Sequence, residues 1–213
     1  MQRYDRSRRL LALAIAALAG WVDASGFLAA DRYFLSFMSG NTTRLAVDLA
    51  QDPQQALVPP GLIAGFLAGV VAGALLADAL PARRKTAVLS LCALLLIASA
   101  AAASTGHVVL MGAAAVLAMG AVNNSYRRDG EVAVGLTYMT GAVVRFGQGL
   151  ASWLRGAPRP GWLVNGALWL AMALGAAAGA MTVLAEASLT PWIGAVGATV
   201  LAIMAWRIER QAS

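Results

Sequence analysis

Six long apolar runs limit what this chain can fold into more than any other feature of its sequence. Each run has roughly 18 to 24 residues, enough for one helix to cross the ~30 Å hydrocarbon layer of a bilayer. The runs lie at roughly 10–30, 60–80, 86–105, 107–126, 161–184 and 190–207. The alternating pattern of a membrane β-barrel is absent from the sequence, so we expect an all-α integral membrane protein.

The composition agrees with this class. Of the 213 residues, 60% are apolar and 12% are charged, whereas an ordinary soluble domain has about one quarter charged residues. A net charge of +6 would suit a nucleic-acid-binding domain, but the basic residues form short groups at the ends of the apolar runs. Such groups orient a membrane protein. We therefore expect a lipid bilayer as partner, and no nucleic acid.

Two polar segments interrupt the apolar runs, at roughly 31–59 and 127–160. Each could be a full span, giving eight crossings, or a re-entrant or broken helix that enters and leaves on one side. Basic residues favour the cytoplasmic side of a membrane. If neither segment crosses, one face collects Arg3, Arg6, Arg8, Arg9, Arg83, Arg84, Lys85, Arg127, Arg128, Arg155, Arg159, Arg207 and Arg210. We expect this arrangement: six crossings, two re-entrant or broken segments and both termini in the cytoplasm.

The two polar segments contain copies of one motif. The sequence SFMSGNTTRLAVDLA at 36–50 matches TYMTGAVVRFGQGLA at 137–151, an offset of 101 positions. Flanking pairs extend the match at an offset of 100: AGWVD at 19–23 with MGAVN at 119–123, and Pro60-Gly61 with Pro160-Gly161. The sequence therefore predicts an internal duplication.

Each copy holds three crossings, so the second copy must insert upside down relative to the first. Inverted repeats of this kind are found in many transporters and channels, whose sites lie near the midplane where interrupted helices meet. We expect a single transmembrane domain over 1–213, with repeats at about 10–105 and 107–207.

Each motif combines a candidate helix break with an arginine one turn later. Gly40 and Gly141 tolerate strained backbone, and Ser39, Asn41 or Thr140 could cap the helix that follows. A helix N-terminus carries about half a positive charge, and the arginines would add two full charges. We therefore expect a small anion or carboxylate-bearing solute to bind at Ser39, Gly40, Asn41, Thr42, Arg44, Thr140, Gly141 and Arg145.

A second interpretation gives the arginines a structural role. An arginine at the membrane centre costs at least ~2.5 kcal/mol unless it is paired or hydrated, and Asp23 and Asp48 are available as partners. Asp23 falls opposite Asn123 and Asn124 in the second copy, so the two halves differ in charge there. Asp23 could carry a coupling proton or form an ion pair with an arginine.

Glycines at intervals of four residues predict close helix packing. They are Gly65, Gly69 and Gly73 in one run and Gly175 and Gly179 in another. The partner helix could lie in the same chain or in a second copy, so a homodimer through these glycine-rich helices is one expectation.

Few residues capable of catalysis are present. The chain has one His and one Cys, and few acidic residues lie inside the apolar runs. No nucleotide-binding loop, metal-ligand spacing or Ser-His-acid arrangement is visible in the sequence. We expect no enzyme activity, no metal and no cofactor.

The segments GWVDASGFL, SFMSGNTTRLAVDLA and AMGAVNNSYRR, together with TYMTGAVVRFGQGLA, resemble the YoaK-like family of bacterial multi-pass membrane proteins, a family named as a domain of unknown function. The resemblance covers nearly the whole chain. It implies an inner-membrane protein with about six helices, and it supplies no substrate.

Three functions remain open from the sequence. The leading one is a small secondary transporter or permease for a small solute, an anion being one candidate, bound at a midplane site between the repeats. A passive channel with two re-entrant segments shares every feature described above. A non-transporting membrane scaffold or sensor is the third.

Overall fold

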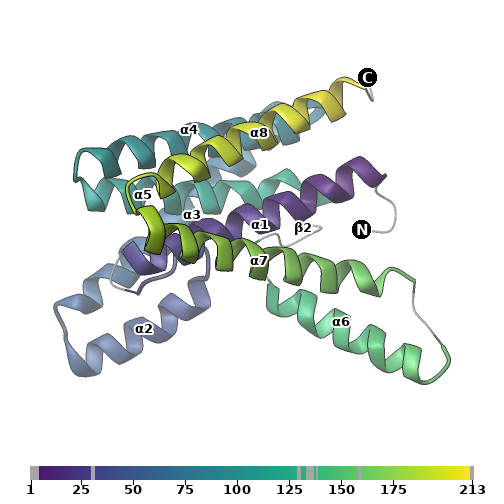
Figure 1. The fold of residues 1–213 in the computed structure, drawn as a ribbon, viewed down its shortest axis with the longest axis horizontal. Coiled ribbons are helices and arrows are strands. Elements are labelled where there is room, and N and C mark those ends of the chain that lie inside the picture. The colour runs from purple at the N-terminus through teal and green to yellow at the C-terminus, as the bar shows by residue number, and fades with distance from the viewer. Residues whose placement is uncertain are drawn as a thin grey trace.

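The six apolar runs are long helices in the computed structural model of the chain (Figure 1). The structure describes residues 5–29, 32–128, 131–132, 137, 139–157 and 160–211, with the backbone alone at 127–128 and 131–132. Arg3, Tyr138 and Arg159, and the side chains of Arg127 and Arg128, lie outside the described residues. The long helices are α1 (Arg6–Ala29), α3 (Val58–Ala79), α4 (Arg84–Ser104), α5 (Val108–Val122), α7 (Trp162–Glu186) and α8 (Thr190–Arg210).

Within the described residues, six helical segments are long and apolar enough to cross a membrane. They include the short 3-10 turns η1 (Gln55–Leu57), η2 (Pro81–Arg83) and η3 (Asn123–Ser125), which extend α3, α4 and α5. The predicted all-α membrane fold with six apolar spanning helices is confirmed.

Two helices that are shorter than any of these six segments correspond to the repeated motif. They are α2 (Met38–Gln51) and α6 (Met139–Leu154), with 14 and 16 residues. At 1.5 Å per residue these helices are about 21 and 24 Å long, too short to cross ~30 Å of hydrocarbon. The eight-span alternative therefore does not fit the structure. Both helices lie on the same flank of the bundle, one toward each end (Figure 1).

Proline and glycine set several helix boundaries. Pro59 and Pro60 lie in the first turn of α3 and Pro191 in the first turn of α8, where a missing backbone N–H costs no intrahelical bond. Gly106 turns the chain between α4 and α5 at φ 76°, a conformation that favours glycine. A two-residue antiparallel ladder, β1 (Arg127–Arg128) with β2 (Glu131–Val132), was not expected from the sequence.

The best-buried apolar side chains lie where α1, α4, α5 and α8 meet. Leu11 and Ile15 of α1, Leu89 of α4 and Met119 of α5 are fully or almost fully buried. By contrast, α3 and α7 flank this core and present many apolar side chains outward, as expected for helices that face lipid. The first turn of α1 and the last turn of α8 lie at the same end of the bundle (Figure 1); we call this the terminal end.

Candidate functional site

The chain turns back into the bundle directly after α1. The N–H of Arg32 donates to the Phe27 carbonyl at 3.0 Å. The N–H groups of Leu35 and Ser36 then both donate to Oδ1 of Asp23 at 2.8 Å, one turn deeper along α1. Asp23 is buried, so its carboxylate fixes the re-entrant backbone. The ion pair that the sequence offered for Asp23, with Arg44 or Arg145, is replaced by these backbone contacts.

The helix break lies earlier in the motif than the sequence suggested. α2 begins at Met38 and α6 at Met139, and Phe37 precedes α2 without a side-chain cap. Ser39, Gly40 and Asn41 are therefore inside the first turn of α2, and the expected caps at Ser39 and Asn41 are wrong. A Cβ at Gly40 would overlap the Phe37 ring. Gly40 serves ring packing and not a strained turn.

Asn41 holds the re-entrant segment to α2. It is fully buried, its Oδ1 accepts the Phe34 N–H at 3.0 Å, and its Nδ2 donates to the Phe34 carbonyl at 2.7 Å. Its amide is thus occupied by the backbone. Thr42 donates to the Met38 carbonyl at 2.9 Å, so these two predicted solute ligands make local contacts in this structure.

Arg44 forms an ion pair with an acid, as the second interpretation of the sequence expected. Its Nη2 lies 3.5 Å from Oδ1 of Asp48, and its guanidinium lies 5.1 Å from the Tyr33 ring centroid. The Tyr33 hydroxyl donates to Oδ2 of Asp48 at 2.8 Å. Desolvation, together with this bond, raises the pKa of the Tyr33 hydroxyl above its ordinary value, which keeps it a donor. Arg44, Asp48 and Tyr33 form one neutralised cluster.

Arg145 has a different environment from Arg44. Its side chain is exposed, and its Nε donates to Oδ1 of Asn165 on α7 at 3.2 Å. Gly149 stands where α2 has Asp48, at the offset of 101. The partner of Arg145 is therefore a neutral amide. The neighbouring Thr140 is also exposed on this flank.

The two motif arginines contact residues of their own halves of the chain. α2 packs against α3, and α6 packs against α7. The structure does not bring Arg44 and Arg145 to a common point, so an anion site shared by Gly40, Gly141 and both arginines stays a prediction.

The asparagines of the second half repeat one of these contacts. Oδ1 of Asn123 accepts from the Thr137 hydroxyl at 3.0 Å, and Thr137 is the counterpart of Ser36 at the offset of 101. Asp23 and Asn123 thus hold the same part of the motif in each half. Nδ2 of Asn124 donates to the Val70 carbonyl of α3 at 3.0 Å, and its counterpart is Ala24.

Glycines form two matching helix crossings inside the chain. A Cβ at Gly69 would overlap the Leu117 carbonyl of α5, and a Cβ at Gly175 would overlap the Ala17 carbonyl of α1. Gly73 and Gly179 approach Ala121 and Trp21 in the same way. These glycine faces are occupied within one chain, so the homodimer expected through them would need another surface.

The register of these crossings corrects one part of the sequence alignment. Ala17 corresponds to Leu117, an offset of 100, but Gly69 corresponds to Gly175, an offset of 106. α4 (84–104) and α8 (190–210) also differ by 106 positions at both ends. The match of Pro60-Gly61 with Pro160-Gly161 at an offset of 100 is therefore not the register in which the helices pack.

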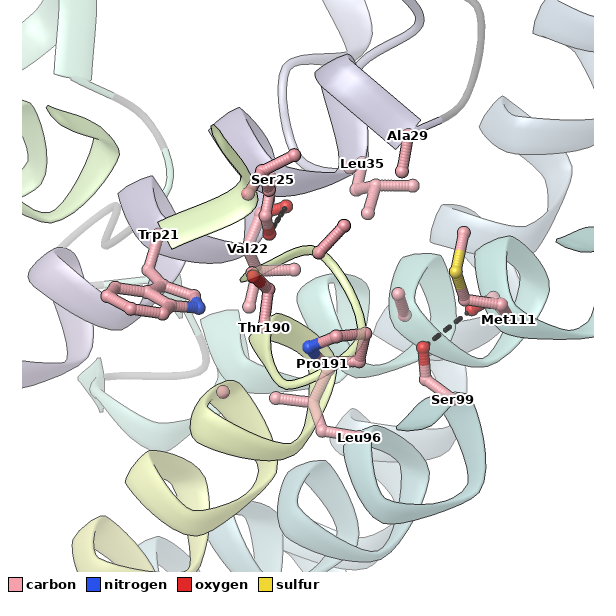
Figure 2. Close-up of a pocket in the computed structure, with 15 residues that line it drawn as sticks. Trp21, Val22, Ser25, Ala29, Leu35, Leu96, Ser99, Met111, Thr190 and Pro191 are labelled. Carbon is pink, nitrogen blue, oxygen red and sulfur yellow. Dashed lines mark hydrogen bonds between the residues drawn. The ribbon is translucent and has the colours of Figure 1, made fainter. Parts of the chain in front are cut away.

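A cavity of about 80 Å³ lies between the two halves, toward the end opposite the terminal end (Figure 2). Its walls come from the second half of α1, the re-entrant segment, α4, α5 and the turn from α7 into α8. The wall is apolar except for Trp21, Ser25, Ser99 and Thr190. Sequence reasoning missed this cavity, because residues from five separate segments form it and no local motif marks it.

A second cavity, of about 290 Å³, lies beside Asp23 between α1 and α7. Apart from Asp23 its lining is apolar and includes Phe27, Phe34 and Met172. The corresponding place in the other half contains Asn124 where this cavity has Ala24. This larger space is an apolar groove at the side of the bundle.

Comparison with known proteins identifies relatives of the chain. Residues 11–204 match the family described as protein of unknown function (DUF1275). The chain is 39% identical over 202 residues to a UPF0700 transmembrane protein of Rhizobium meliloti (strain 1021), covering 94% of this chain and 87% of that protein. No solved structure matches the chain. The six apolar helices and these relatives together show that the chain is a multi-pass transmembrane protein belonging to the DUF1275 family.

Proposed function

We propose that this protein is a small secondary transporter or permease that moves a small solute by alternating access between two inverted halves. The proposal is for transport and not for catalysis. It combines three features of the molecule: the packing of the two halves, the two short helices and the cavity between the halves.

The matching packing of the two halves is the observation that carries the proposal. Exchanging α1, α2, α3 and α4 with α5, α6, α7 and α8 turns each main packing pair either into another pair or into itself. The pair α1–α7 becomes α5–α3, α2–α3 becomes α6–α7, and α4–α5 becomes α8–α1. The pair α4–α8 maps onto itself, as helices beside a two-fold axis do. This supports an inverted repeat, the architecture on which many carriers rock.

The two short helices support the same function. Non-helical backbone at membrane depth persists only where protein buries it or where it lines a wet cavity, because an unpaired amide in lipid costs several kcal/mol. Here the described backbone at 32–37 turns back before α2 begins at Met38, and α6 begins at the matching residue Met139. In carriers, interrupted helices of this kind stand beside the solute path.

The orientation follows from the basic residues at the terminal end. The Tyr126 hydroxyl donates to the Arg8 carbonyl, and Lys85 Nζ lies 5.4 Å from the Tyr126 ring centroid. Glu209 accepts the N–H groups of Lys85 and Thr86. Because these contacts bring basic residues of α1 and α4 together at one end, we propose that this end is cytoplasmic and that the membrane is the bacterial inner membrane.

A topology reporter tests this orientation. A full-length protein carrying a reporter between Pro81 and Lys85 is expected to read as cytoplasmic, and one at Gly106 as periplasmic, because basic turns stay on the cytoplasmic side. Reporter activity in cells is the measurement. A periplasmic signal near Lys85 would contradict both the orientation and the six-span topology.

Two observations bear on the charge of the solute. Arg145 is exposed and bonded to a neutral amide, which favours an anion at the flank of α6. The cavity between the halves is lined by uncharged residues, which favours a neutral solute there. Both solute classes belong in a transport test.

Flux into proteoliposomes tests the proposed function. We expect gradient-driven uptake of one class of small solute, from a panel of acetate, chloride, urea, glycerol and acetamide, to exceed the leak of protein-free vesicles and to saturate with concentration. Stopped-flow light scattering measures this. Flux that rises without saturation would identify a channel, and the absence of flux for the whole panel would contradict the proposal.

Two arginine variants distinguish transport through an anion site at the motif from transport elsewhere in the protein. If an anion is carried at the motif, Arg145→Gln is expected to lower its flux at least tenfold, because one compensating charge is lost. Arg155→Gln is the matched control, since Arg155 is exposed in the turn after α6. Equal anion flux in both variants would place the solute elsewhere.

A further inference from the structure

We propose that the cavity in Figure 2 is a binding site for a small neutral solute bearing both a hydrogen-bond acceptor and a hydrogen-bond donor, such as a short primary amide, with Trp21 as its principal ligand. The inference deepens the proposed function by naming its solute class. It rests on that function only for the role of the site in transport.

The place of the cavity suits a solute site in a carrier. Its walls join both halves of the chain: Trp21, Ser25 and Leu96 come from the first half, and Met111 and Thr190 from the second. A rocking motion of one half against the other would therefore change the cavity directly. Figure 2 shows these side chains around one common space.

One hydrogen-bond donor of the wall is unused. Nε1 of Trp21 is buried, with no hydrogen-bond partner among the described residues. An indole N–H can only donate. Figure 2 shows the indole nitrogen on the side of the ring that faces Thr190. A solute with an acceptor oxygen would satisfy this N–H.

The three hydroxyls of the wall present acceptors. Ser25 donates to the Val22 carbonyl at 3.2 Å, Ser99 to the Met111 carbonyl at 2.8 Å, and Thr190 to the Glu186 carbonyl at 3.0 Å. Each hydroxyl proton is thus committed to backbone, which leaves oxygen lone pairs for a ligand. One donor and several acceptors match a carbonyl oxygen and an N–H or O–H of a single small molecule.

The wall of the cavity offers no counter-charge to a bound ion. The described residues that line the cavity carry no charged side chain. An ion that enters such a site loses its hydration without gaining a counter-charge, and this is costly. The lining therefore selects a neutral solute.

The terminal end of the molecule supports the choice of a neutral solute. At the offsets of 100 and 106, Gly26 corresponds to Tyr126 and Gly194 to Val88. Tyr126 and Val88 are fully buried, and the Tyr126 hydroxyl bonds to the Arg8 carbonyl. At the terminal end the chain thus fills the corresponding region with its own neutral ring and hydroxyl. At the other end Gly26 and Gly194 carry no side chain, and the Leu35 side chain packs against Gly26.

The volume limits the size of the solute. An engineered cavity of about 150 Å³ holds benzene, and this one measures about 80 Å³. A solute smaller than benzene fits, and acetamide is a suitable probe.

Three probes of similar size test the site. Protein in lipid nanodiscs is titrated with acetamide, acetate or ethylammonium, and its thermal unfolding midpoint is followed. A ligand that binds only the folded state raises this midpoint. We expect a saturable increase with acetamide and none with the two ions.

Variants of residues that line the cavity test whether acetamide binds there. Trp21→Phe keeps the ring and removes the N–H, and it should weaken acetamide binding about tenfold, the usual value of one hydrogen bond. Gly194→Ala places a methyl group 3.5 Å from Nε1 of Trp21 and should abolish binding. Gly61→Ala, with no neighbouring atom within 4 Å, is the matched control. If Trp21→Phe fails to fold, Gly194→Ala decides.

Several results would overturn the proposal. They are no saturable effect of acetamide, an acetamide effect that Gly194→Ala leaves unchanged, and stabilisation by acetate that Arg145→Gln removes and Gly194→Ala does not. Acetamide binding without solute flux would leave the site in place and would contradict the transport function alone.

Discussion

Replacing Gly69 or Gly175 with alanine is expected to destabilise the protein by about 3 kcal/mol, the upper part of the range for overpacked interiors. The reason is that each new methyl group would overlap a backbone carbonyl, of Leu117 on α5 or Ala17 on α1. Backbone cannot move aside as a flexible side chain can, so two helices must separate and lose their close packing. For a chain of this length the unfolding midpoint should fall by roughly 6–12 °C. Thermal unfolding of the purified variants in nanodiscs measures it.

Alanines at open glycines are the controls. Gly112 on α5 and Gly147 on α6 have no atom within 4 Å of an added Cβ. Alanine there removes backbone freedom from the unfolded chain and should stabilise by up to about 1 kcal/mol. The two crossings are counterparts, so their losses should also be similar. A large loss at Gly69 with none at Gly175 would contradict the matched packing of the two halves.

The spanning helices could be predicted because the signal is local. An unbroken apolar run of sufficient length has few stable structures in lipid other than a helix, and no information about its neighbours is needed. The shortness of the motif helices followed from their polar residues and from the placement of Arg83, Arg84 and Lys85. These predictions needed no knowledge of helix packing.

The register of the repeat could not be read from local matches. The motif offset of 101 becomes 106 in the next helix, because the second half has five more residues between the end of the motif and the glycine of the crossing. The identical Pro-Gly pairs at 60 and 160 then suggested the wrong alignment. Only the contacts of Gly69 with Leu117, and of Gly175 with Ala17, reveal which positions correspond.

The partners of the polar motif residues could not be predicted from the sequence either. An ion pair with an arginine was one of the two roles that the sequence offered for Asp23, but its carboxylate binds the amides of Leu35 and Ser36. A sequence records side chains, whereas the unsatisfied groups of a re-entrant segment belong to its backbone. Arg44 pairs with Asp48, four residues later on the same helix. Helical spacing does predict a pair of this kind.

Asp23→Ala is expected to cost about 3 kcal/mol, because it leaves two buried amide groups without an acceptor. The amides are those of Leu35 and Ser36, both in the segment that turns back along α1. The unfolding midpoint of the purified variant in nanodiscs measures the loss. Amide hydrogen exchange localises it, since protection should fall at 32–37 and stay unchanged in α4 and α8.

Asp23→Asn separates the structural role of this residue from a role in proton coupling. Asparagine keeps an acceptor oxygen, and Asn123 already uses one toward Thr137 in the second half, so this variant should lose only about 1 kcal/mol. Asparagine cannot carry a proton.

A folded Asp23→Asn protein that transports passively but no longer responds to a pH gradient would assign Asp23 to coupling. Normal pH-driven transport would limit Asp23 to holding the re-entrant backbone. A loss of stability equal to that of Asp23→Ala would show that the charge itself, and not the acceptor oxygen, holds the two amides.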